Sequence, residues 1–206
     1  MKKQEIDHRT LKLMVAIVAF FLASVTSLLA GNAINSISDS YHHGGPARDT
    51  FVGAMFAISA FMAAYNGLSR WEGVLARVVA VAALGVALFP GGSIDDCTMV
   101  SVVHAVASVV MFLSLAGMCH VFRSRAMKKA NRPADRRARI YRICAVVMVA
   151  SMSVVVIDHF TGGLIIHRLP RLVFYCEMVA LLAFGVAWLA ASHVLPWITA
   201  PQERWF

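Results

Sequence analysis

His104 and Glu177 are ionisable residues that stand inside two long apolar runs of the sequence. His104 is about five residues into its run and Glu177 about six, so at ~1.5 Å per residue both lie roughly 8–9 Å below the same edge. A charged side chain at that depth in a membrane is costly unless it has a partner or a water-filled pocket. A His and a Glu that meet there could bind a divalent metal ion or transfer protons, which makes both candidate catalytic residues.

More polar residues gather at the same edge and extend this candidate site. Asp158 is a third candidate catalytic residue, and the candidate metal ligands are His104, Asp39, His42 and His159. Zinc fits such nitrogen and oxygen donors, whereas haem is disfavoured because no two histidines stand at convincingly matched depths. The spacing of these residues matches no specific metal motif, so a solvated loop and an ordinary helix end remain open as alternatives.

The composition indicates which elements must position these residues. The chain has 206 residues, of which 59% are hydrophobic and 15% charged, and its mean hydropathy is +0.70. Soluble domains carry about 25% charged residues. Apolar runs of about 20 residues cross the hydrocarbon core as helices, because lipid cannot satisfy an exposed backbone. We therefore predict an all-α, six-helix transmembrane bundle that forms a single domain over residues 1–206. The expected spans are 13–30, 50–66, 74–89, 99–122, 143–158 and 172–195.

The basic residues set the expected orientation of this bundle. Residues 123–142 hold nine basic residues and one acid, and we interpret them as a cytoplasmic loop. The first twelve residues are also basic, which together with six spans places both termini in the cytoplasm. This clustering argues against nucleic acid as a partner and for a lipid bilayer, with a bacterial inner membrane as the default. A cleaved signal peptide ending near Ala30 is the alternative for the first span.

Cysteine usage adds one further expectation. Cys97 and Cys176 both fall near the outer side, where a disulfide could form, and the sequence leaves that bond open. The many small residues in the helices suit a compact monomer and an oligomer equally well, so the oligomeric state also stays open.

Several short motifs give most of the chain a recognisable pattern. They are Ser36–Tyr41, Arg48–Gly53, Ala64–Gly67, Leu84–Pro90, His104–Ala105, Glu177 and Phe184–Trp188. Together they resemble a family of small bacterial integral membrane proteins classed as a domain of unknown function. The resemblance implies six helices and supplies no activity.

A more distant likeness concerns the polar residues alone. One membrane face is similar in kind to the His and Asp zinc sites of alkaline ceramidases and progestin/adiponectin-type receptors, and it carries Ser38, Asp39, His104, Asp158 and His159. Those membrane hydrolases have seven helices and an H-x-x-x-H pair on the last, where this chain has Glu177. The likeness is an analogy only.

Three functions follow from the sequence and are carried forward. The first is an outward-facing, metal-dependent membrane hydrolase. The second is a proton- or ligand-responsive transporter or sensor that takes a lipid or small molecule. The third is an accessory membrane protein whose polar groups only join helices.

Overall fold

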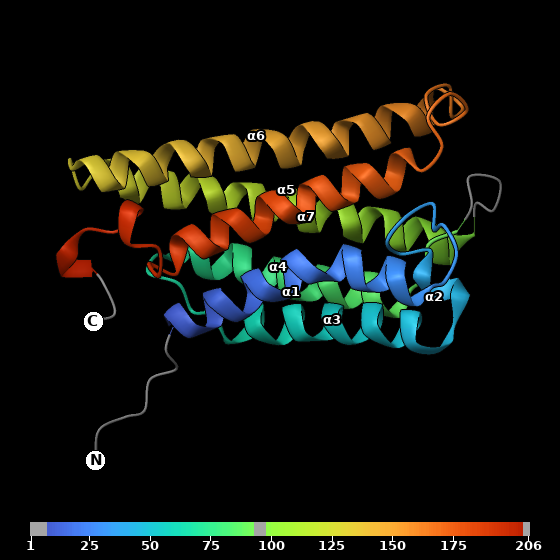
Figure 1. The fold of residues 1–206 in the computed structure, drawn as a ribbon, viewed down its shortest axis with the longest axis horizontal. Coiled ribbons are helices and arrows are strands. Elements are labelled where there is room, and N and C mark those ends of the chain that lie inside the picture. Colours follow the sequence, from blue (N-terminus) through green and yellow to red (C-terminus); the bar gives the residue numbers. More distant parts are fainter. Residues whose placement is uncertain (1–7, 93–97, 204–206) are drawn as a thin grey trace, which may run out of the picture.

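Seven α-helices make up most of the chain in a computed structural model that describes residues 8–92 and 98–203 (Figure 1). They are α1 (His8–Leu29), α2 (Ser40–His43), α3 (Gly45–Ala64), α4 (Arg70–Leu88), α5 (Met99–Met127), α6 (Arg132–Phe160) and α7 (Leu172–Ala191). Two 3-10 turns follow, η1 (Pro196–Ile198) and η2 (Pro201–Glu203). No strand occurs in these two described ranges.

The six long helices form a ring in which neighbours along the chain run in opposite directions. Each long helix packs against the next along the chain, and α1 closes the ring against α7. Six of the described helices are long and apolar enough to cross a membrane, which confirms the predicted all-α bundle. The α5–α6 connection, the beginning of α1 and η2 lie at the left in Figure 1, whereas α2 and the α6–α7 connection lie at the right. We call the left the inner end, because the positive-inside rule assigns its basic residues to the cytoplasm, and the right the outer end.

The expected cytoplasmic loop 123–142 is largely helical, which corrects that interpretation. α5 continues to Met127 and α6 begins at Arg132, so only residues 128–131 connect them. Asn131 starts α6 by accepting a hydrogen bond from the backbone of Ala134 at 2.9 Å. Helices can continue past the hydrocarbon because long basic side chains reach the headgroups and water.

Other helix ends also differ from the expected spans. α3 begins five residues early, at Gly45, where Pro46 suits a first helical turn. α7 ends at Ala191 rather than at residue 195, because the chain turns at His193 before Pro196. Both shifts arise from local turn chemistry that hydropathy does not report.

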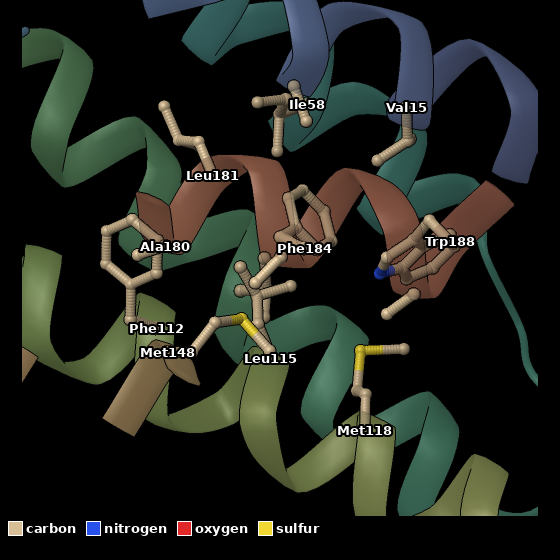
Figure 2. Close-up of a cluster of buried hydrophobic side chains, with 14 of the residues drawn as sticks. Val15, Ile58, Phe112, Leu115, Met118, Met148, Ala180, Leu181, Phe184 and Trp188 are labelled. Carbon is tan, nitrogen blue, oxygen red and sulfur yellow. The ribbon is translucent and has the colours of Figure 1, made fainter. Parts of the chain in front are cut away.

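Aromatic and sulfur side chains fill the centre of the ring (Figure 2). Phe184 and Trp188 from α7 are fully buried, and their rings meet edge to face at 5.7 Å between centroids. Val15 from α1, Ile58 from α3 and Leu115 from α5 are buried around them. The α7 helix therefore supplies Trp188, the largest fully buried side chain among the described residues.

The outer surface of the ring is apolar. Phe21, Val81, Val106 and Val146 come from four different helices and are each more than half exposed. A surface so rich in large apolar side chains indicates contact with lipid rather than with water. The chain is therefore a multi-pass membrane protein.

Close helix approach at Gly85 gives the first testable prediction. A Cβ at Gly85 would lie 2.9 Å from the Ala107 Cβ on α5, whereas a Cβ at Gly53 would meet nothing within 4 Å. We expect Gly85→Ala to lower the midpoint of thermal unfolding in detergent, because two packed backbones must separate. Gly53→Ala is the matched control and should leave the midpoint unchanged or higher. Equal midpoints for both variants would contradict this packing.

Candidate functional site

A pocket lies at the outer end of the ring and contains both residues that the depth count singled out. Its empty space, counted together with the open solvent at its mouth, is about 320 Å³. The apolar lining residues are Leu22, Ile37, Phe51, Met55, Val86, Phe112 and Leu181, and the polar ones are Ser38, His104, Ser108 and Glu177. Five of the six long helices and the segment between α1 and α2 contribute. Mostly apolar walls with a few polar groups are typical of small-molecule sites.

The Glu177 carboxylate holds the chain segment that covers this pocket. Its Oε2 accepts a hydrogen bond from the backbone N–H of Ile37 at 2.5 Å. Ile37 is almost fully buried, so its amide needs an acceptor within the protein. We call residues 34–43, which include α2, the outer lid.

Two further contacts fix the outer lid to the beginning of α7. Arg171 Nε donates to the carbonyl of Ile34 at 2.8 Å, and Phe174 N donates to the carbonyl of Asn35 at 2.9 Å. Together with Glu177 these residues recur every three positions, which keeps them on one side of the helix. The Phe174 amide lies in the first turn of α7, where backbone N–H groups have no acceptor within the helix. The carbonyl of Asn35 in the lid therefore serves as its acceptor.

His104 faces the same pocket and also bonds to backbone. Its Nδ1 lies 2.7 Å from the carbonyl of Phe89, at the end of α4. A Cβ on Gly91 would come within 3.3 Å of the His104 ring and 3.2 Å of Ser38 Oγ, so the chain after α4 lies directly on both side chains. His42 of the lid bonds to the carbonyl of Gly91 at 2.5 Å and ties the lid to that chain.

His104 and Glu177 therefore share a pocket without pairing with each other. The expectation that each would be the other's partner is replaced by two separate bonds to backbone groups. The backbone N–H of Ser38 also donates to Glu177, and His104 keeps a second ring nitrogen beyond its bond to Phe89. The arrangement can supply a carboxylate and an imidazole to a molecule in the pocket.

The other residues singled out in the sequence lie around the outer end. Asp39 accepts from the backbone of Asn35 at 3.1 Å and thereby shapes the lid. Asp158 is buried at the end of α6 and accepts from Ile165 N at 2.7 Å, so it organises the α6–α7 connection. His159 is exposed, and its ring meets that of Phe160. None of these three lines the pocket.

The metal hypothesis has no geometric counterpart in the described ranges. Across residues 8–92 and 98–203, no three His, Cys, Asp or Glu side chains are arranged so that they could hold a metal ion. His104, Asp39, His42 and His159 as zinc ligands stay a prediction. A Cys97–Cys176 disulfide also stays a prediction, because Cys97 lies outside the described residues.

An ion pair at the inner end escaped the sequence reasoning. Glu72 is fully buried at the start of α4, and its two carboxylate oxygens accept from Arg125 Nη1 of α5 at 2.7 and 2.8 Å. The same carboxylate accepts from Leu68 N at 2.5 Å, and Lys12 of α1 lies close by over the ring of Tyr65. This cluster joins α1, α4 and α5 where the helices leave the hydrocarbon.

The sequence contains a signal for the position of Glu72 at a helix start, although not for its partner Arg125. Ser69 and Glu72 have the Ser-x-x-Glu spacing of a helix start, and Ser69 Oγ accepts from Glu72 N at 3.2 Å. In the usual form the glutamate returns to the N-terminal cap of its own helix. Here it bonds instead to Leu68 and Arg125, a choice that depends on where α5 packs.

Comparison with known proteins identifies a family and no function. Residues 13–187 match the family described as "Protein of unknown function (DUF998)". No curated protein and no solved structure matches the chain. The matched range contains every residue that lines the outer pocket.

The buried ion pair yields a stability prediction. Glu72→Gln keeps the side-chain volume and leaves Arg125 without its carboxylate, so we expect unfolding to become easier by about 3–5 kcal/mol. Asp49→Asn is the matched control, because Asp49 and Arg48 form an exposed pair 3.6 Å apart. That change should cost less than about 1 kcal/mol. Urea unfolding in detergent micelles measures both, and similar losses for the two variants would refute a structural role for Glu72.

Proposed function

The chain belongs to the DUF998 family, and from this premise we propose that it is a ligand-binding membrane protein of the sensor or transporter class. Its outer pocket takes a small molecule with an apolar body and one hydrogen-bond donor. The observation that carries the proposal is that Glu177, which faces the pocket, also holds the lid through the Ile37 amide.

The chemistry of the pocket supports this class of ligand. Seven apolar residues would contact an alkyl or aromatic body, and burial of that surface would supply most of the affinity. Glu177 would accept a hydrogen bond from an amine or a hydroxyl group, and an amine would add an ionic attraction. His104 and Ser108 from α5 would orient the polar end of the ligand.

The shared role of Glu177 couples binding to lid movement. A donor on the ligand competes with the Ile37 amide for the same carboxylate. Loss of that bond leaves Arg171, Phe174 and the bond from Ser38 to Glu177 as contacts between the lid and α7. Binding would then favour a lid position that differs from the one described, which is a ligand-induced shift between two states.

An enzymatic function has weaker support than ligand binding. Hydrolysis would need an activated nucleophile or a metal-bound water, and Asp158 and His159 do not line the pocket with His104. The bonds of Glu177 and His104 to backbone groups favour positioning over proton transfer.

Binding of n-decylamine to the chain in zwitterionic lipid nanodiscs tests the proposal. We expect a saturable rise in thermal stability with decylamine and none with n-decanoate, because Glu177 would repel a second carboxylate. Glu177→Ala should weaken the binding about tenfold or more, as loss of a charge-assisted hydrogen bond does.

Two bulky substitutions on α5 separate the pocket from the lipid-facing surface. Ser108→Phe places a ring in the pocket and should abolish the effect of decylamine, whereas Val106→Phe projects into lipid and should preserve it. The proposal fails if decylamine and decanoate act alike, or if both α5 variants behave alike.

A further inference from the structure

A second pocket lies at the inner end, between α5, α6 and the end of α7, and it is strongly basic. Its empty space is about 260 Å³. The residues around it are Phe122, Arg125, Ala126, Lys129, Arg137, Tyr141, Ala191 and His193. Four of these eight residues carry basic nitrogen atoms, so the pocket is suited to an anion.

One carboxylate of the protein already lies on these basic groups. Glu203 in η2 accepts from Arg137 Nη2 at 2.8 Å and forms an ion pair with Lys129. Its Oε2 is also 3.6 Å from His193 Nδ1. Burial opposes ionisation of Glu203, but the bonds from Lys129 and Arg137 outweigh it and lower the pKa of Glu203 to about 2. The chain segment after α7 thus brings an anion to this pocket.

Positive charge exceeds negative charge around the pocket. Among residues 8–92 and 98–203, Arg125, Lys129 and Arg137 form ion pairs with two carboxylates, those of Glu72 and Glu203. Lys12 adds a further cation, with its ammonium 5.3 Å from the centre of the Phe122 ring that lines the pocket. Arg137 is itself almost fully buried, so its charge has little access to water. A second anion would therefore be attracted even with Glu203 in place.

His193 provides an independent indication of a ligand. Its Nδ1 is buried and makes no hydrogen bond. Its backbone has a φ of 62°, a left-handed conformation that favours glycine or asparagine directly after a helix. Strained residues that keep a polar atom unsatisfied are found where a ligand binds. Burial lowers the pKa of His193 to about 4, so the ring is neutral at pH 7 and can donate one hydrogen bond.

We propose that the inner pocket binds a phosphate group through Lys129, Arg137 and His193, and that the Glu203 carboxylate competes with it for these residues. Arginine and lysine are the usual partners of phosphate. A basic pocket between transmembrane helices on the cytoplasmic side is well placed for the headgroup of an anionic phospholipid. Free phosphate from the cytoplasm presents the same chemistry. The site is separate from the outer pocket and does not depend on its function.

Three variants of the full chain in detergent test the site. The two probes are dihexanoyl phosphatidylglycerol and sodium phosphate, each titrated at constant ionic strength and measured by native mass spectrometry. Lys129→Gln should weaken binding about fivefold, which corresponds to one basic contact. Glu203→Gln should tighten it, because the competing carboxylate is lost. Arg139→Gln removes an exposed charge of α6 outside the pocket and should leave the affinity near that of the unchanged protein.

The outcomes distinguish the sources of the phosphate group. Binding of both probes with this pattern supports a site for phosphate itself, and binding of phosphatidylglycerol alone supports a lipid headgroup site. The proposal is overturned if neither probe binds, if Lys129→Gln and Arg139→Gln have the same effect, or if Glu203→Gln fails to tighten binding. Size-exclusion profiles establish that each variant is folded.

Discussion

The hydrocarbon core of a bilayer offers no water to a polar group, and this constraint explains where the polar side chains of this protein lie. Backbone groups must bond within the protein, so the chain crosses as helices. The carboxylates of Glu72, Asp158 and Glu177 lie near the two ends of the ring and bond to backbone groups or to an opposite charge. Glu177 and Glu72 are the main examples, one near each end, and both accept from backbone amides as well.

The two ends use this constraint in different ways. At the outer end, Glu177 satisfies a buried amide of the lid and also faces a largely apolar pocket, so one carboxylate links structure to binding. At the inner end, Glu72 neutralises Arg125, while Glu203 cannot balance both Lys129 and Arg137. The two proposed ligands differ accordingly, with a hydrogen-bond donor at the outer end and an anion at the inner end. A protein with sites of opposite preference at its two ends suits a role in sensing or transport across the membrane.

Hydropathy was sufficient to predict the six apolar helices, because their positions follow from the cost of burying polar groups in lipid. Counting residues from the helix ends also brought His104 and Glu177 to one depth, and both line the same pocket. The hydrogen-bond partners of these two side chains could not be predicted, because they are the backbone groups of Ile37 and Phe89, and every residue carries such groups. The pairing of Glu72 with Arg125 depends on how α4 packs on α5, and no local pattern encodes that contact. The prediction of a loop at residues 123–142 is wrong, because a run of charged residues does not by itself end a helix that leaves the membrane.

The central claim is that Glu177 holds the outer lid over the pocket. Hydrogen exchange of the backbone amides in residues 34–41 tests it most directly, because the Ile37 amide exchanges only when its bond to Glu177 opens. The account predicts slow exchange of this segment in the unchanged protein and much faster exchange in Glu177→Ala, with the amides in the middle of α7 unaffected. Rapid exchange in both proteins, or equal protection in both, would contradict it.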